Sequence, residues 1–368
     1  MKKMALMLVG ILLASGLRSE ANDRGQGWAV FFVRGLNSQA AVPPPIIQEF
    51  QLEFPSIPVV TARIGDGSPA ATRKGLYQQL DDIGQDAMTN AVLNGKRVIV
   101  VGGSQGGLLA RAFIERYGDK VPFTVDSFMS LAGQHCGQFG LPDGWESYID
   151  EILGHSDIQL LNQFAQMFGI KLSKVEELAD MTVEEVISLQ LEQEIADRGI
   201  IDTLRAFIAS AIKKLVKKDF PLIRFVFYTP LAQHLISVAG YWKDPMHRLD
   251  YLAFNQFLPV FNNEREHADA ARYKTNMAKL RYVIFFWAGN DSMIKPSCSA
   301  AFRFFKWGSR TELQQVFTET IQYQQNLLGL RDLYDQGKFF FESPAGMGHD
   351  CGGPAIPIAM NYFNKIIA

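Results

Sequence analysis

In the first third of the chain, short and almost wholly apolar runs alternate with longer segments in which apolar residues recur every three or four positions. The runs have the length and the β-branched and aromatic content of buried strands, whereas the longer segments have the spacing of helices that face a core. The predicted strands are residues 28–33, 57–64, 96–101 and 125–131, and the predicted helices are 71–93 and 105–117. Because strands that alternate with helices form a mostly parallel central sheet with helices on both faces, we predict an α/β fold.

The alternation stops in the middle of the chain and returns near its end. From about residue 145 to about residue 241 the sequence is almost wholly helical in character. A strand pattern returns at 281–287 and at 339–341, and residues 355–367 have the pattern of a closing helix. We therefore expect one sheet domain over residues 22–368, with a helical insertion between two of its strands.

The amino-terminal residues resemble a secretory signal peptide, which we predict to be residues 1–21. Residues 1–3 are positively charged, residues 4–13 are apolar, and small residues follow at cleavage-site spacing. An uncleaved apolar helix is the alternative. No later segment reaches the ~20 uninterrupted apolar residues of a membrane span. The sequon Asn290-Asp291-Ser292 fits a glycoprotein of the secretory pathway.

Composition excludes several classes of function. The formal net charge is −2 at pH 7 and no basic stripe dominates, so we expect no nucleic-acid partner. Cys136, Cys298 and Cys351 are too few and too far apart for a disulfide framework; at most one bridge forms and one thiol remains. Neither these cysteines nor the six histidines have zinc-binding spacing, and we predict no metal and no cofactor.

An apolar strand, a glycine-rich turn and a helix meet at Ser104. The sequence is Val98-Ile99-Val100-Val101-Gly102-Gly103-Ser104-Gln105-Gly106. A Gly-x-Ser-x-Gly turn between a strand and a helix holds the serine nucleophile at the top of an α/β-hydrolase sheet. The turn is tight, and a side chain at residue 102 or 106 would clash with the flanking strand or helix. We therefore predict an α/β-hydrolase fold with Ser104 as nucleophile and the helical insertion as a lid over the substrate pocket.

A serine nucleophile needs a histidine base and an acid that orients it, and in this fold they follow in the order Ser, acid, His. Only His349 lies after the last predicted strand, in a glycine-containing loop, so we predict it as the base. Asp291 follows the strand 281–287 and is the predicted acid. Asp350, Asp244 and Glu342 are weaker alternatives, because Asp350 is the immediate neighbour of His349 and the other two do not follow that strand.

The tetrahedral intermediate of acyl transfer needs two backbone N–H donors for its oxyanion. We assign one to Gln105, the residue after the nucleophile, and the other to Leu36, in the loop after strand 28–33. The alternative for Arg34-Gly35-Leu36-Asn37 is an ordinary turn that ends a strand. His135 follows the strand next to the elbow, and its alternative role is a structural hydrogen bond.

Longer stretches of the chain resemble palmitoyl-protein thioesterases. They are Gly103–Gly107, Gly133–Pro142, Tyr241–Pro245, Tyr251–Asn263, Asn290–Ser292 and Leu328–Arg331 with Gly337-Lys338, ending at His349. The run Gly-Gln-His-x-Gly-x-Phe-Gly-Leu-Pro at 133–142 is much more specific than the elbow. The resemblance covers nearly the whole predicted mature chain except the central helical stretch. It implies the triad Ser104, Asp291 and His349, the oxyanion amides of Leu36 and Gln105, and a His135 that is not catalytic.

The chain departs from this family in two places. The family usually has His-Gly in the oxyanion loop and an Asp soon after, where this chain has Arg34-Gly35-Leu36-Asn37-Ser38. A backbone donor survives such replacements. The helical insertion is also longer here by some tens of residues, so pocket residues in it are not carried over from the family.

The resemblance implies a lysosomal or secreted enzyme that cleaves long-chain acyl (palmitoyl) thioesters from S-acylated cysteines of proteins or peptides, through an acyl-enzyme. A cysteine thiolate, with a pKa of about 8.5, leaves more readily than an alkoxide, which lowers the demand on general acid catalysis. A lipase or carboxylesterase acting on oxygen esters would have the same triad and is the first alternative. The second is an inactive hydrolase-fold binding protein, against which the complete set of three residues argues.

The insertion carries an apolar stripe with lysines beside it. The stripe is Leu204, Phe207, Ile208, Ala211, Ile212, Leu215 and Val216, and the lysines are residues 213, 214, 217 and 218. A basic amphipathic helix binds anionic membrane surfaces, which would give peripheral membrane contact near S-acylated substrates. The alternative is that the stripe packs on its own domain and the lysines form a solvated face.

Overall fold

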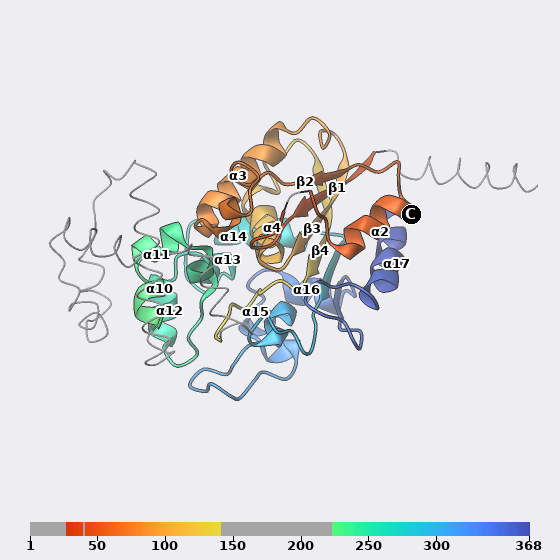
Figure 1. Cartoon of the computed structure of the whole chain (residues 1–368). Coiled ribbons are helices and arrows are strands. Elements are labelled where there is room, and N and C mark those ends of the chain that lie inside the picture. Colours follow the sequence, from red (N-terminus) through yellow and green to blue (C-terminus); the bar gives the residue numbers. More distant parts are fainter. Residues whose placement is uncertain (1–26, 40, 141–222) are drawn as a thin grey trace, which may run out of the picture.

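Six strands form one parallel sheet in the order β2-β1-β3-β4-β5-β6. The computed structural model describes residues 27–39, 41–140 and 223–368 (Figure 1). The predicted signal peptide, most of the helical insertion and its stripe at 204–218 lie outside these residues. The strands are β1 (Trp28–Val33), β2 (Val59–Thr61), β3 (Arg97–Gly103), β4 (Thr124–Leu131), β5 (Tyr282–Phe286) and β6 (Phe339–Glu342).

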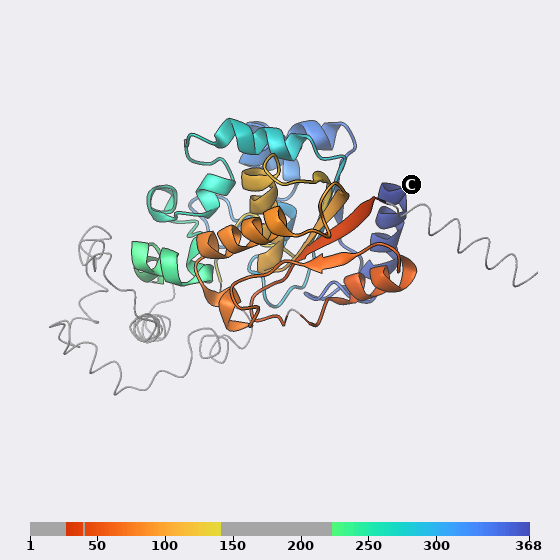
Figure 2. The same cartoon turned by 90° about the horizontal axis from the view of Figure 1, so that it is seen from above.

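Helices cover both faces of the sheet (Figures 1 and 2). The longer helices are α2 (Pro45–Glu53), α3 (Leu76–Thr89), α4 (Gln105–Tyr117), α14 (Ala270–Ala278) and α17 (Ala355–Ile367). The shorter ones are α10 (Arg224–Phe227), α11 (Pro230–Leu235), α12 (Arg248–Phe254), α13 (Leu258–Phe261), α15 (Ile321–Gln324) and α16 (Leu330–Asp335). Single 3₁₀ turns are η1 (Ala70–Arg73), η3 (Ser237–Tyr241), η4 (Ser297–Ala301) and η5 (Phe317–Glu319).

The sheet separates two apolar cores because successive side chains of a strand point to opposite faces. In β1, Phe31 and Val33 face the core under α3, α4 and α14, whereas Val30 and Phe32 face the core under α2 and α17. Every residue of β1 is buried, as expected for a strand covered on both sides. This arrangement confirms the predicted α/β-hydrolase fold.

Several predicted elements have the expected bounds, and two differ for local reasons. β1, α4 and α17 begin and end where the sequence predicts, whereas β2 is shorter than the predicted strand 57–64. The predicted helix 71–93 is interrupted, because Lys74 is extended and a Cβ at Gly75 would lie 2.1 Å from the carbonyl oxygen of His234. The chain therefore makes the turn η1 before α3 begins.

Helix α2 was not predicted from the sequence. Pro45 stands in its first turn, where a missing N–H costs nothing, and Ile46, Ile47 and Phe50 are its buried residues. Phe50 packs on Phe363 of α17 with ring centroids 4.5 Å apart. The proline followed by this spacing is a signal that could have identified the helix.

The strand order reverses direction between β1 and β3. The chain passes from β1 to β2 on one side and then returns to β3 on the other side of β1, after which β4, β5 and β6 follow outward. In open α/β sheets, ligands bind beyond the carboxyl ends of the strands at such a switch point. The register pairs Val33 with Gly102, so the loop after β1 lies beside Ser104.

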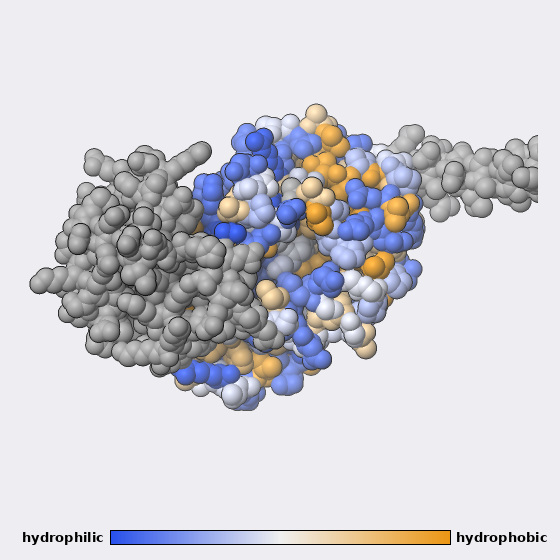
Figure 3. Space-filling view, viewed as in Figure 1, coloured by the Kyte–Doolittle hydropathy of each residue, from blue (hydrophilic) through white to orange (hydrophobic). Residues whose placement is uncertain are grey.

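The visible surface is mixed in polarity. On the face shown in Figure 3, hydrophobic residues of the described part lie in small groups among hydrophilic ones. The most exposed large apolar side chains include Leu52, Val42 and Leu249. Among the described helices, none combines the length and the apolar content needed to cross a membrane.

Candidate active site

The backbone at Ser104 has a conformation that few non-glycine residues adopt. Its φ is 53° and its ψ is −128°, between the end of β3 and the start of α4. Close packing holds it there: a Cβ at Gly102 would lie 2.3 Å from the carbonyl oxygen of Gly106, and one at Gly106 would lie 2.2 Å from that of Val33. The Ser104 N–H donates to the carbonyl of Leu131 at 2.7 Å. Only glycine fits at 102 and 106, as the sequence predicts.

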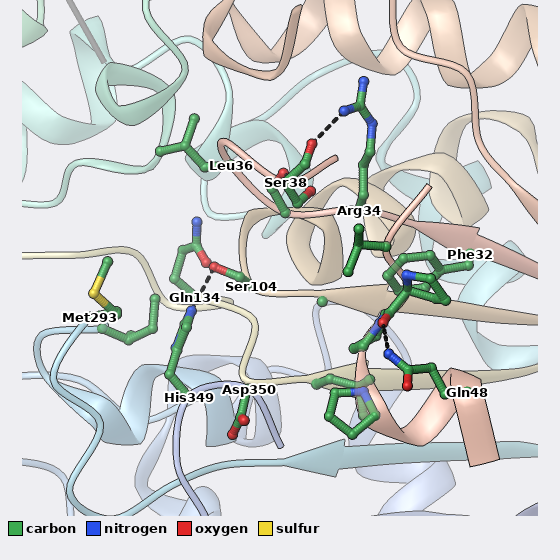
Figure 4. Close-up of a pocket in the computed structure, with 18 of the residues that line it drawn as sticks. Phe32, Arg34, Leu36, Ser38, Gln48, Ser104, Gln134, Met293, His349 and Asp350 are labelled. Atoms are coloured by element: carbon green, nitrogen blue, oxygen red, sulfur yellow. Dashed lines mark hydrogen bonds between the residues drawn. The ribbon is translucent and has the colours of Figure 1, made fainter. Parts of the chain in front are cut away.

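Ser104, His349 and Asp291 form a continuous line of hydrogen bonds, although they lie far apart in the sequence. Ser104 Oγ is 3.0 Å from His349 Nε2 (Figure 4). On the other side of the ring, His349 Nδ1 is 2.8 Å from Asp291 Oδ2. An ionised carboxylate only accepts hydrogen bonds, so the Nδ1 proton belongs to His349. Nε2 is then free to accept the Ser104 hydroxyl proton.

The acid is held more tightly than the base. The backbone N–H groups of Met293 and Ile294 donate to Asp291 Oδ1 at 2.7 and 3.1 Å. The Asp291 side chain is 1% exposed and that of His349 is 24% exposed. The Asp291 carboxylate is thus buried, and both of its oxygens accept hydrogen bonds. The His349 imidazole is partly exposed and lines the cavity.

The two backbone amides that the sequence predicts as oxyanion donors belong to segments that touch. Leu36 lines the cavity beside Ser104, and Gln105 is the first residue of α4. A Cβ at Gly35 would lie 2.9 Å from the carbonyl oxygen of Gly103 and 3.0 Å from Ser104 Cβ, so the loop after β1 runs directly against the elbow. Within the described residues, neither the Leu36 nor the Gln105 N–H donates a hydrogen bond.

Arg34 fixes this loop, a role that the sequence did not predict. It is 1% exposed, and its guanidinium donates to the carbonyl oxygen of Ser38 at 2.6 Å (Figure 4). It also donates to the carbonyl oxygen of Ser68 at 3.1 Å. Burial lowers the pKa of Arg34, with Asp66 opposing that effect. An arginine beside a glycine in a strand-ending turn gives no sequence signal for such a role.

The cavity above Ser104 has a volume of about 440 Å³. Its lining is largely apolar, and Gln48, Gln134 and Asp350 contribute polar groups (Figure 4). Apolar lining residues are Phe32, Leu36, Val42, Pro43, Pro44, Pro45, Leu131, Met293 and Ile294. A concave, largely apolar site that also contains the Ser104–His349 pair suits an apolar ligand with one reactive polar group.

His135 has a different setting from His349. Its ring stacks on Phe285 at 4.3 Å and on Phe302 at 5.2 Å, and it is fully buried. Arg111 Nε donates to its Nδ1 at 3.2 Å, and its Nε2 is 2.7 Å from Ser130 Oγ. Burial and the Arg111 charge hold the pKa of His135 well below its usual value. This is a neutral structural histidine with both ring nitrogens engaged.

The cysteines are free and buried. Burial raises the pKa of Cys298 to about 11 and that of Cys136 to about 12. Cys351 is two residues after the candidate base, and its Sγ is 3.8 Å from the carbonyl oxygen of His349. In the described part of the chain, no group of three or more His, Cys, Asp or Glu side chains is arranged to hold a metal ion.

Several known proteins are similar to this chain in sequence or, more distantly, in structure. Palmitoyl-protein thioesterase 3 of Dictyostelium discoideum is 26% identical over 314 residues, which are 85% of this chain and 82% of that protein. The lysosomal thioesterase PPT2 homolog of Drosophila melanogaster is 25% identical over 264 residues, which are 71% of this chain and 65% of that protein. A solved monoacylglycerol lipase from Paleococcus ferrophilus is 12% identical with a TM-score of 0.38, over 93% of this chain and 95% of that one.

A family model decides the assignment. The model for palmitoyl protein thioesterases matches residues 29–349, which include Leu36, Ser104, Asp291 and His349. The matched span is most of the 368-residue chain and contains the elbow, the sheet except Trp28, and the cavity lining except Asp350. This match confirms the family that the sequence resembles and the prediction that the protein is a hydrolase. This chain is an enzyme of the α/β-hydrolase fold and belongs to the palmitoyl protein thioesterase family.

Proposed function

We propose that this protein hydrolyses long-chain acyl thioesters of S-acylated cysteines through a covalent acyl-Ser104 intermediate. One observation carries the proposal. The hydrogen-bonded line from Ser104 through His349 to Asp291, at 3.0 and 2.8 Å, opens into a largely apolar cavity of about 440 Å³.

The proposed reaction has two halves. Ser104 Oγ attacks the thioester carbonyl carbon while His349 Nε2 takes the hydroxyl proton, and the N–H groups of Leu36 and Gln105 stabilise the oxyanion. The C–S bond then breaks, the cysteine sulfur leaves as a thiol with the proton from His349, and the acyl group stays on Ser104. A water, deprotonated by His349, attacks the acyl-enzyme and releases the fatty acid. Asp291 keeps His349 oriented and stabilises its charged form throughout.

The leaving group favours thioesters over oxygen esters. A thiol has a pKa of about 8.5, so the C–S bond breaks with little help from a general acid. The family assignment supports the same substrate class.

We further propose that the protein acts in the secretory pathway, in the lysosome or outside the cell. The predicted signal peptide and the name of the Drosophila relative, a lysosomal thioesterase, support this. Asn290 and Ser292 of the predicted sequon are exposed. The apolar stripe at 204–216, with lysines 213, 214, 217 and 218 beside it, is a candidate for peripheral membrane contact, and packing on its own domain is the alternative. Equal co-sedimentation with anionic vesicles by the wild type and a four-lysine-to-glutamate variant would reject the membrane role.

The proposed function is tested by comparing palmitoyl-thioester and p-nitrophenyl-ester hydrolysis across acyl lengths. We expect the highest kcat/KM for long-chain thioesters, and no turnover by Ser104→Ala. A fluorophosphonate should label the wild type and not Ser104→Ala. A strong preference for short oxygen esters would assign the protein to the esterases instead, and failure to label the wild type would support an inactive binding protein.

A further inference from the structure

Thr72 lies outside the cavity lining, yet it contacts both segments that carry the candidate oxyanion amides. It is fully buried in the turn η1. Its hydroxyl accepts the N–H of Asn37 at 2.8 Å and donates to the carbonyl oxygen of Pro69 at 2.6 Å. Asn37 follows Leu36 directly and has a φ of 57°, a left-handed conformation that needs such support.

The carbonyl group of the same residue binds the other segment. Thr72 O accepts the side-chain Nε2 of Gln105 at 2.8 Å and that of Gln79 at 2.8 Å. Gln105 Nε2 is also 3.1 Å from Gln79 Oε1, and Gln105 is 1% exposed. The side chain of Gln105 is therefore anchored at the carbonyl group of Thr72.

A further bond steadies the first segment from the same turn. Arg73 Nε donates to Asn37 Oδ1 at 2.7 Å. Two successive residues of η1 thus hold the backbone N–H and the side chain of Asn37. Because oxyanion stabilisation depends on donors held within a few tenths of an ångström, the spacing of the two amides depends on this turn.

We propose that Thr72 is a positioning residue that sets the spacing between the Leu36 and Gln105 amides. The inference rests on the proposed function only in that Ser104 attacks an acyl carbonyl. It is independent of whether the leaving atom is sulfur or oxygen. Thr72 acts through other residues and does not touch the substrate.

The test uses Thr72→Val, which removes the hydroxyl and keeps the size and the backbone carbonyl. Four quantities are measured: kcat and KM for a long-chain thioester, the affinity for a long-chain alkyl trifluoromethyl ketone, and the affinity for an S-hexadecyl-cysteine peptide. Ser104 Oγ adds to the carbonyl carbon of the ketone and forms a tetrahedral oxyanion. The thioether peptide occupies the pocket without reacting. We expect kcat and ketone affinity to fall about 10- to 100-fold, less than the loss of a whole donor, and thioether affinity to stay within about 2-fold.

Thr72→Ser keeps the hydroxyl and should restore kcat to within about 3-fold of the wild type. Thr320→Val is the matched control. Thr320 is buried, donates to the carbonyl oxygen of Phe317 at 2.7 Å and accepts the N–H of Tyr323 at 3.3 Å, in a turn that does not line the cavity. The Thr320→Val variant should be less stable than the wild type, with the same ratio of ketone affinity to thioether affinity.

Arg73→Met provides a second variant at a partly exposed site, in case Thr72→Val does not fold. It should shift the same ratio in the same direction by a smaller factor. Unchanged ratios in both variants, or equal losses of ketone and thioether affinity, overturn the inference. If the wild type cleaves only oxygen esters, the proposed function fails, and the same ratios measured with an ester still decide the role of Thr72. A wild type that does not bind the ketone overturns both.

Discussion

The groups on the two sides of Ser104 differ in kind: one side consists of side-chain groups and the other of backbone N–H groups. On the proposed acid–base side, Asp291 and His349 would act through side-chain atoms whose identity the chemistry requires. On the proposed oxyanion side, Leu36 and Gln105 would contribute only backbone N–H groups, and the buried side chains of Arg34 and Thr72 hold the loop that contains Leu36. A backbone donor tolerates many side chains. This explains how the loop at 34–38 departs from the family's usual His-Gly pattern while its position beside the elbow is retained.

The largest expected effect is on the acid–base side, in Asp291→Asn. The carboxamide can donate to His349 Nδ1, which would place the imidazole proton on Nε2, the wrong nitrogen for a base. We expect kcat to fall about 10³- to 10⁴-fold with KM little changed. Steady-state kinetics with a long-chain thioester measure this, and a thermal melt shows that the variant is folded. A loss below about 10-fold would mean that Asp291 does not orient the base.

The next effect breaks the oxyanion side without removing any polar group. Gly35→Ala places a Cβ 2.9 Å from the carbonyl oxygen of Gly103, which pushes the 34–38 loop away from the elbow. We expect kcat/KM to fall about 100-fold, comparable to the loss of one oxyanion donor. Gly289→Ala is the matched control on the acid–base side, because a Cβ there meets no atom within 4 Å. Equal activity of the two variants would contradict the close fit proposed for the loop.

The smallest effect on chemistry is expected at His135, which sharpens the contrast with His349. His135→Gln should leave kcat/KM within about 3-fold and reduce the free energy of unfolding by about 2 kcal/mol, because Arg111 and Ser130 lose a partner. Urea denaturation measures the change. A large loss of kcat at unchanged stability would show that His135 takes part in the reaction.

The pH dependence of the same variant follows from the lowered pKa of His135. The unfolded chain binds a proton at this residue below about pH 6.5, whereas the folded protein does not. This residue therefore lowers the stability of the wild type as the pH falls below about 6.5, and has no such effect above it. Since glutamine does not titrate, the difference between wild type and His135→Gln should be smaller at pH 5 than at pH 7.5.

The sequence predicts the acid–base side because its signals are local and chemical. Ser104 stands between a β-branched strand and a helix, and Asp291 and His349 follow predicted strands in the order that the fold demands. The same logic predicts the bounds of β1 and α4. Each of these inferences depends on residues close in sequence to the feature itself.

The side chains that hold the oxyanion side could not be predicted, because they are distant in sequence from the residues that they contact. Thr72 stands 35 positions from Asn37 and 33 from Gln105, and a threonine in a polar turn is unremarkable on its own. The break before α3 depends on the contact of Gly75 with residue 234, which no local pattern encodes. Contacts of this kind arise from the topology, which brings the loops after β1 and β3 to one edge of the sheet.

The left-handed backbone of Ser104 has a consequence for the use of this protein as a reagent. A non-glycine residue in a sparsely populated conformation costs about 1–3 kcal/mol, and at φ 53° this cost belongs to the residue that we propose as the nucleophile. Ser104→Gly removes the Cβ together with the nucleophile. We therefore expect a variant that melts at a higher temperature than the wild type and still accepts the acyl chain. Such a protein would serve as a durable bait for isolating lipid-modified polypeptides from cell extracts.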